Sequence, residues 1–139
     1  MTKPYEKKRK YPKKEGNFLK SFMEELSILN PDIWHFKTHG EAMQTKGVPD
    51  VIMCYNRMFV AIEFKIMRSG NIMVTPYQEY TIDKINKANG ITAVIWWDEG
   101  SGEVGIGSTR FATTKKLVIH FNTVLKVASS MFNLSTRTA

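Results

Sequence analysis

The sequence predicts one α/β domain with an α-β-β-β-α-β core, a small central mixed sheet flanked by helices, and an added C-terminal strand and helix. Three observations support this fold class. Residues 48–66 are largely apolar and rich in β-branched side chains, residues 91–97 form a nearly continuous apolar run, and apolar residues recur at helical spacing before and after them. The length of 139 residues suits a single domain.

The first helix is expected over residues 16–29, because apolar side chains recur there at helical spacing, at Phe18, Leu19, Phe22, Met23 and Leu26. The Asn-Pro-Asp segment at 30–32 ends this helix. In residues 33–38, Ile33, His35 and Lys37 alternate with Trp34, Phe36 and Thr38, and this period of two predicts a short strand. The polar, glycine-flanked segment 40–47 predicts a loop.

Two strands, at about 48–55 and 58–66, are expected to form a hairpin around Asn56-Arg57, although Asn-Arg is a less favourable turn than Asn-Gly. The second helix should begin after Thr75, which suits the N-cap, with proline at N1 and glutamine at N3. Asn89-Gly90 marks the end of this helix. The tyrosines of its first turns, Tyr77 and Tyr80, are interpreted as packing residues.

The remainder of the chain predicts a strand at 91–97, with at least one of Trp96 and Trp97 in the core. Glycines at 100, 102, 105 and 107 indicate turns around a short strand. A last helix is expected over 113–132, with apolar positions Leu117, Val118, Phe121, Val124, Leu125, Ala128 and Phe132.

The net charge of +7 is unevenly placed, and most of the excess precedes the domain. Residues 1–15 hold seven Lys and Arg against two Glu, whereas the rest of the chain is nearly balanced. Residues 1–14 are therefore interpreted as a flexible basic arm, in which Pro4 and Pro12 disfavour a continuous helix, ahead of a domain at 15–139. Such an arm suits phosphate backbones. A solubilising tail or a sorting signal would have the same composition.

No apolar run approaches the roughly 20 residues of a membrane span, and the basic N-terminus lacks the apolar segment of a secretory signal. We therefore expect a soluble cytoplasmic protein with no membrane partner. The one cysteine, Cys54, lies in an apolar strand, so we expect a reduced and buried thiol.

The hairpin gathers charged residues on one side of the sheet. If Tyr55 faces Met58 across the turn, Asp50 lies directly opposite Glu63 on one face, with Cβ atoms roughly 4.5–5.5 Å apart. Lys65 shares that face, because side chains alternate along a strand. A register shift of one residue would abolish the arrangement.

Two carboxylates this close repel each other unless a cation lies between them, and Mg²⁺ commonly binds one or two carboxylates with waters and a substrate phosphate. A metal so held can activate water, and Lys65 can orient that water or stabilise developing charge. The alternative is a solvent-exposed sheet surface on which Lys65 pairs diagonally with Glu63.

The ordered segments GVPD at 47–50, FVAIEFK at 59–65, TPYQ at 75–78 and GITAV at 90–94 resemble the VRR-NUC branch of the PD-(D/E)xK nuclease superfamily. The resemblance covers about residues 15–97, with 98–139 as a C-terminal addition. It implies a restriction-endonuclease-like core and hydrolysis of DNA phosphodiesters that depends on Mg²⁺, with Mn²⁺ as a possible substitute.

The resemblance also implies roles for individual residues. Asp50, Glu63 and the carbonyl of Phe64 would bind the metal, Lys65 would be the catalytic lysine, and Gln78 would hold water or DNA near the metal. Gln78 has a structural alternative as the N3 residue of the Thr75 capping box. The family carries an acid on its first helix, for which Glu15 fits the helical spacing best and Glu24 and Glu25 compete.

Further polar residues have open assignments. His35 and His39, followed by Glu41, are interpreted as structural or DNA-contacting rather than zinc ligands, because the segment predicts a strand running into a loop. Basic residues are candidate nucleic-acid contacts, either in the arm or, with Thr38, near the mouth of the site; they are Lys7, Lys8, Arg9, Lys10, Lys13, Lys14, Lys37, Lys46 and Arg68.

Minimal members of this branch resemble phage-encoded, structure-selective nucleases that cut branched DNA such as four-way (Holliday) junctions. The expected function is therefore a metal-dependent DNA endonuclease that acts as a homodimer, with the apolar face of 113–132 available for a dimer interface or for the monomer core. A non-catalytic DNA-binding module with this fold, and a nuclease directed at single strands or RNA, are the alternatives.

Overall fold

A computed structural model describes residues 4–38 and 46–137 of the chain, with side chains described for 15–38 and 46–134. It confirms the α/β class, with a six-stranded mixed sheet flanked by helices. The elements are α1 (Pro4–Leu29), β1 (Trp34–Lys37), β2 (Val51–Tyr55), β3 (Met58–Met67), α2 (Pro76–Lys87), β4 (Ile91–Asp98), β5 (Val104–Ile106), β6 (Thr109–Phe111) and α3 (Thr114–Arg137).

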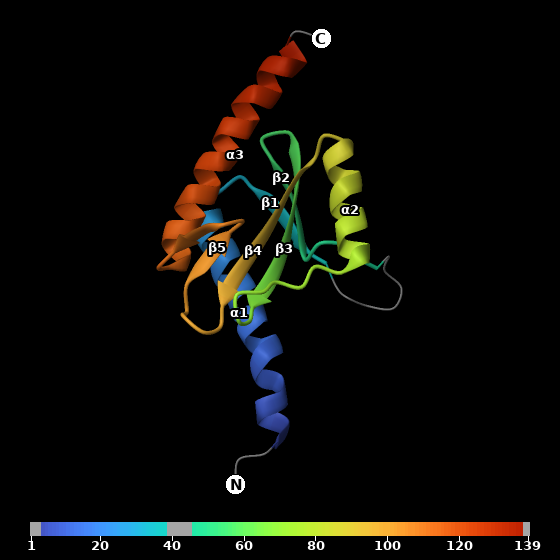
Figure 1. Cartoon of the computed structure of the whole chain (residues 1–139). Coiled ribbons are helices and arrows are strands. Elements are labelled where there is room, and N and C mark those ends of the chain that lie inside the picture. The colour runs from blue at the N-terminus through green and yellow to red at the C-terminus, as the bar shows by residue number, and fades with distance from the viewer. Residues whose placement is uncertain (1–3, 39–45, 138–139) are drawn as a thin grey trace.

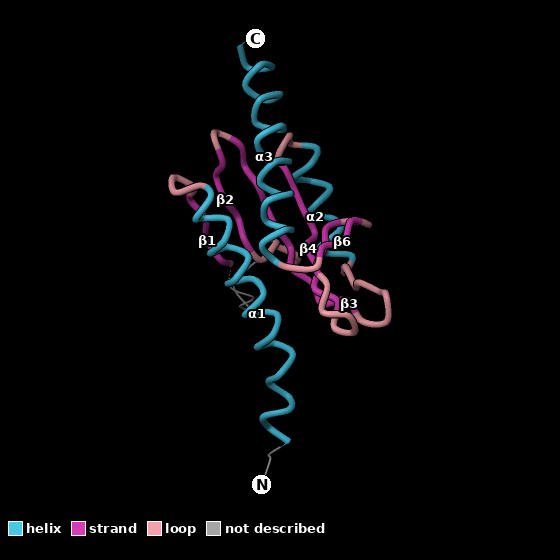
Figure 2. The backbone as a smooth tube through the Cα atoms, turned by 90° about the vertical axis from the view of Figure 1, so that its left-hand side faces the viewer, coloured by secondary structure: helices cyan, strands magenta, loops and turns pink. Residues whose placement is uncertain are grey.

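The strands lie in the sheet in the order of the chain, β1 to β6. β3 and β4 are parallel and the other neighbouring strands are antiparallel. Parallel neighbours need a crossover, and α2 provides it on one face of the sheet (Figure 1). α1 and α3 contact each other and cover the opposite face, and their outer ends extend beyond the sheet in opposite directions (Figure 2).

The core lies between the sheet and the α1–α3 layer. Along β3 the residues Val60, Ile62 and Phe64 face this layer and are fully or almost fully buried. The Phe64 ring meets the rings of Phe18 and Phe22 edge to face, at centroid distances of 5.7 and 5.4 Å. All five apolar positions predicted for the first helix are buried, so its amphipathic pattern is confirmed.

The hairpin register is confirmed: Tyr55 pairs with Met58, and the ladder continues to Val51 opposite Ile62. Both turn residues, Asn56 and Arg57, have positive φ angles of 44° and 76°, as a type I′ turn requires. The Asn56 amide also donates a hydrogen bond to the Ser129 hydroxyl of α3. This tertiary contact helps to explain why a turn without glycine is tolerated.

Several boundaries differ from those predicted. The first helix begins at Pro4 and includes Pro12, so the expectation that the two prolines prevent a helix in the arm is wrong. Pro4 lies in the first helical turn, where its missing N–H costs nothing. Pro12 lies inside the helix, and the contacts of the described residues give no reason for its place there. The region after β4 contains two short strands instead of one, and the last helix extends to Arg137.

The exposure of some side chains also corrects the sequence prediction. Cys54 is a free cysteine but is exposed, because it lies on the face of β2 opposite the core. Tyr77 and Tyr80 are 59% and 64% exposed and are not packing residues. Val124, predicted within the apolar face of α3, is exposed, whereas Trp96 is 1% exposed, as expected for one of the two tryptophans.

None of the helices in the described ranges combines the length and apolar character needed to cross a membrane.

Candidate active site

Four polar side chains converge in the carboxyl-terminal half of β3, next to the first turn of α2. Glu63 and Lys65 come from β3, Asp50 directly precedes β2, and Gln78 lies in the first turn of α2. Strand alternation turns Glu63 and Lys65 away from the α1–α3 core, on which Phe64 packs. The predicted cluster is therefore present, on the α2 side of the sheet.

Asp50 is held by hydrogen bonds although it lies outside the strand ladder. The backbone N–H of Phe64 donates to Asp50 Oδ2 at 2.8 Å. On the other side, the N–H of Thr38 donates to the Asp50 carbonyl at 2.8 Å, and the Thr38 hydroxyl donates to the Pro49 carbonyl at 2.7 Å. These contacts from β3 and from the end of β1 fix both the backbone and the carboxylate of Asp50.

Glu63 is the most constrained acid of the site. Its side chain is almost fully buried; Oε2 accepts a hydrogen bond from Gln78 Nε2 and lies 3.6 Å from Lys65 Nζ. Oε1 is buried and has no hydrogen-bond partner among the described residues. Burial first, and then the contact with the Asp50 carboxylate, raise the pKa of Glu63 to about 8.

Gln78 performs the capping role and the site role together. Its Oε1 accepts from the backbone N–H of Thr75 at 3.0 Å, which completes the predicted capping box. The same oxygen accepts from Lys65 Nζ at 2.8 Å, while Nε2 donates to Glu63. The amide therefore links the start of α2 to both charged residues of β3.

Glu15 is the first-helix acid whose charge couples to this cluster. It is half-buried, and its pKa is raised by burial and then by the nearby Asp50 carboxylate. The positive charges of Lys65, Arg68 and Lys37 oppose this rise. Glu15 lies on the face of α1 that carries Phe18, beyond the core and toward the end of β3.

The competing acids of α1 lie elsewhere. Glu24 is exposed, and it lines a pocket with His35, about two and a half helical turns from Glu15. His35 Nε2 lies 3.5 Å from the Ser27 hydroxyl. His39 and Glu41 lie outside the described residues.

The predicted basic contacts are found in three settings. Lys37 and Arg68 are exposed near the acids, and Arg68 forms an ion pair of 3.2 Å with Glu99. Lys46 lies 5.4 Å from the centroid of the Tyr77 ring. The side chains of the arm lie outside those described, namely Lys7, Lys8, Arg9, Lys10, Lys13 and Lys14.

The donors at the site suit a hard divalent cation. Within the described residues no group of three or more His, Cys, Asp and Glu could hold a metal, so the protein would offer the carboxylates of Asp50 and Glu63. Mg²⁺ is commonly bound through one or two carboxylates and retains waters. Glu63 Oε1 is buried and accepts no hydrogen bond from the part of the chain that the structure describes, so it is the atom that such a cation would contact.

Two residues that position the site were not recognised in this role from the sequence. Thr38 fixes the backbone at Asp50, and Gly47 lets its loop approach α2 closely. Gly47 has a φ of 85°, and a Cβ placed there would lie 2.3 Å from the Tyr77 carbonyl oxygen. The glycine two residues before Pro49 was the available signal for this close approach.

Comparison of the sequence with protein-family models matches no family, and comparison with curated proteins finds no relative.

We predict that Gly47→Ala costs on the order of 3 kcal/mol of unfolding free energy, because left-handed strain adds to the collision with α2. Gly102→Ala is the matched control, since Gly102 has a similar φ of 79° with no atom within 4 Å of an added Cβ. This control should lose only about 1 kcal/mol. Urea unfolding measures both, and equal losses would contradict the packing role of Gly47.

We also predict that the metal-free protein becomes less stable as pH rises toward 8. The folded-state pKa of Glu63 is raised from 4.5 to about 8, so the folded chain holds the proton more tightly than the unfolded chain. The resulting stabilisation is complete below the unfolded pKa and is lost as pH rises through about 8, by on the order of 5 kcal/mol.

Urea unfolding in EDTA between about pH 5 and about pH 9 tests this expectation. Glu63→Gln should be nearly free of this component, because the amide resembles the protonated acid. Glu24→Gln, at an exposed position of α1, should behave as the wild type. A wild-type profile that parallels that of Glu63→Gln would contradict the prediction.

Proposed function

We propose that this protein is a Mg²⁺-dependent DNA endonuclease that hydrolyses phosphodiester bonds. The observation that carries the proposal is the buried Glu63 carboxyl group, which contacts the Asp50 carboxylate while Lys65 and Gln78 hold its Oε2. Its Oε1 accepts no hydrogen bond from any described residue. If the Lys65–Glu63 ion pair were purely structural, a second acid beside Glu63 would not be expected. Asp50 makes it more costly to ionise the buried Glu63 carboxyl group.

Asp50 and Glu63, with the carbonyl of Phe64, would hold the cation, which supplies Lewis-acid activation of water and of the phosphodiester. The chain's own residues orient the reaction. Lys65 Nζ is directed by Gln78 Oε1 at 2.8 Å and by Glu63 at 3.6 Å. An ammonium fixed in this way can orient the attacking water or stabilise the charge that develops on the phosphate.

Glu15, Lys37 and Arg68 form the rim of the site in this proposal. The acid adds negative potential beside Asp50, and the two bases are exposed and able to contact phosphates of the bound strand. The seven bases of residues 1–14 would add further phosphate contacts in this proposal.

The proposed substrate is branched DNA such as a Holliday junction, cut by a homodimer that presents two sites to two strands. Most of the predicted α3 face instead completes the monomer core, including Leu117, Phe121 and Leu125. A second stripe on α3 is exposed at alternating spacings of three and four residues, at Val124, Val127, Met131 and Leu134, which is coiled-coil spacing. We assign the dimer contact to this stripe.

We expect Mg²⁺-dependent cutting that is lost in Lys65→Ala and in Asp50→Asn, by about 100-fold or more in rate. A labelled panel of single strand, duplex, flap and four-way junction, in DNA and RNA forms, with Mg²⁺, Mn²⁺ or EDTA, measures this. Lys87→Ala is the control, because Lys87 pairs with Asp83 at the far end of α2. Tight binding without cutting of any substrate would favour the non-catalytic module.

The dimer is tested separately by sedimentation. The wild-type chain should sediment as a dimer, and Val127→Glu should shift it to a monomer, because two like charges would face each other across the contact. Ile28→Glu is the control, since Ile28 is 73% exposed but lies on α1 away from the stripe. A monomeric wild type, or equal effects of the two substitutions, would remove the α3 interface from the proposal.

A further inference from the structure

One face of α2 combines exposed aromatic rings with lysines. Tyr77 and Tyr80 are 59% and 64% exposed. The ammonium of Lys46 lies 5.4 Å from the centroid of the Tyr77 ring, and that of Lys84 lies 5.6 Å from the centroid of Tyr80. We call these four residues the tyrosine–lysine strip. Together with Pro76 and Thr81, most of the strip lines an open pocket of about 610 Å³.

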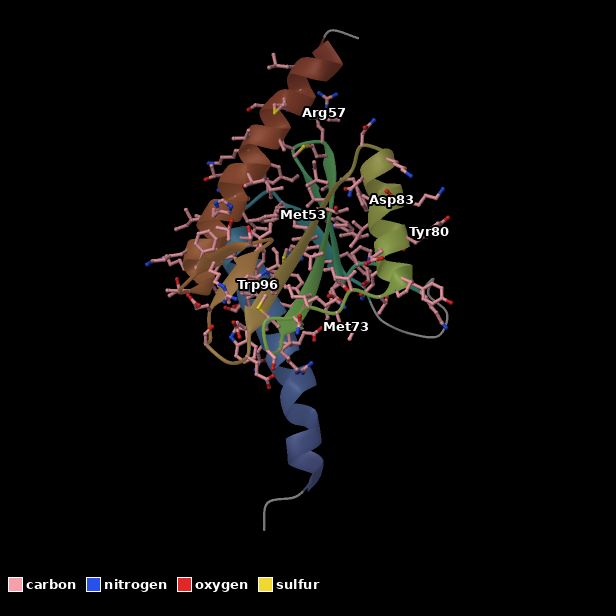
Figure 3. The ribbon with its side chains drawn as sticks, in the orientation of Figure 1. Met53, Arg57, Met73, Tyr80, Asp83 and Trp96 are labelled. Carbon is pink, nitrogen blue, oxygen red and sulfur yellow. The ribbon has the colours of Figure 1, made fainter. Side chains whose placement is uncertain are left out.

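Helix geometry separates this strip from the acids of α2. At about 100° per residue, Tyr77, Tyr80 and Lys84 lie within about 60° of one another. Glu79 lies about 100° beyond Tyr80, on a different side of the helix. Asp83 borders the strip, about 60° from Tyr80, and forms a 2.9 Å ion pair with Lys87. Figure 3 shows Tyr80 on the side of α2 that points away from the sheet. The strip therefore presents aromatic surface and positive charge, and the one acid of α2 that borders it, Asp83, is paired with Lys87.

The strip contributes little to the core. α2 has no buried residue at all, and its sheet-facing positions are only half-buried. Two large tyrosine rings on its outer face therefore cover no part of the sheet. Exposed aromatic residues flanked by lysines are the composition of surfaces that bind single-stranded nucleic acid, where bases stack on the rings and the cations contact phosphates.

The strip is continuous with the candidate active site. Tyr77 directly precedes Gln78, whose amide holds Glu63 and Lys65. The loop that carries Lys46 approaches α2 at Gly47, so closely that a Cβ there would lie 2.3 Å from the Tyr77 carbonyl oxygen. The strip and the site therefore meet at the first turn of α2, where Tyr77 of the strip adjoins Gln78 of the site.

We propose that the tyrosine–lysine strip binds an unpaired single-stranded segment of the nucleic-acid substrate, with bases stacked on Tyr77 and Tyr80 and phosphates near Lys46 and Lys84. The placement of this segment beside a scissile phosphate rests on the proposed nuclease function. The binding itself does not. A substrate read in this way has unpaired bases next to the cut, as at flaps and at opened junctions, and continuous duplex does not engage the strip.

The test measures binding by fluorescence anisotropy in EDTA, where cleavage cannot interfere. The probes are a labelled oligo(dT) of about 12 nucleotides, the matching oligo(rU), and a labelled duplex of the same length. Tyr77→Leu and Tyr80→Leu keep apolar bulk and remove the aromatic ring. Phe59→Leu is the matched control, since Phe59 is also an exposed aromatic residue, at 46%, but lies on β3 outside the strip.

Each tyrosine variant should weaken oligo(dT) binding about tenfold, while duplex binding changes by less than about twofold and Phe59→Leu binds as the wild type. Lys84→Gln should weaken the single strand more than Lys87→Gln, whose lysine is paired with Asp83. Equal weakening on oligo(rU) extends the site to RNA, and weakening on oligo(dT) alone restricts it to DNA; both support the strip.

Unchanged oligo(dT) binding in both tyrosine variants would overturn the inference and leave the face to another occupant, such as a protein. Equal loss on duplex and single strand would also overturn it, because a contact with the phosphate backbone alone would then suffice. Tyrosine-dependent binding without cleavage of any substrate would leave the strip established and reject the nuclease. Cleavage of a substrate without tyrosine-dependent binding would support the nuclease and reject the strip as a binding site.

Discussion

The hydrogen bond from the Phe64 N–H to Asp50 Oδ2 links the hydrophobic core to the charged cluster of the candidate site. Phe64 packs its ring into the α1–α3 core, while its neighbours Glu63 and Lys65 point to the opposite face. A single strand thus carries the centre of the core on one side and the charged cluster on the other. A shift of β3 along β2 by one residue would move Phe64 out of the core, and it would separate the charged side chains of the site at the same time.

The charged cluster of Asp50, Glu63, Lys65 and Gln78 also lowers the stability of the folded protein. The carboxylates of Asp50 and Glu63 repel each other on the α2 side of the sheet. The raised pKa of Glu63 reflects the free-energy cost of ionising its carboxyl group there. Nearby residues compensate in part: Gln78 and Lys65 contact one oxygen of Glu63, and Thr38 fixes the backbone of Asp50. Conflict of this kind between local stability and charge placement is characteristic of sites kept for function.

Much of the arrangement could be predicted from the sequence because it depends on local periodicity. The turn at Asn56-Arg57 sets the pairing of β2 with β3, and the pairing places Asp50 near Glu63. The Thr75 capping box was visible in four consecutive residues. Local rules specify these features, so no knowledge of the rest of the fold was needed.

The errors arose where tertiary context decides. Cys54 is exposed because the helix on its side of the sheet covers β4 and leaves β2 open, which no property of the strand reveals. Tyr77 and Tyr80 are exposed because α2 approaches the sheet with another face. The structure brings together five residues of the candidate site, and the roles proposed for them come from their chemistry and from the resemblance; they are Glu15, Asp50, Glu63, Lys65 and Gln78.

The double role of Gln78 Oε1 couples helix formation to the electrostatics of β3. The oxygen that caps the first turn of α2 is also the one that holds the Lys65 ammonium. Because α2 buries no residue, it should be among the first elements to open when the chain fluctuates, while the sheet stays folded. Each such opening would release the lysine from its position, so local unfolding of one short helix suffices to disassemble the site within an otherwise intact domain.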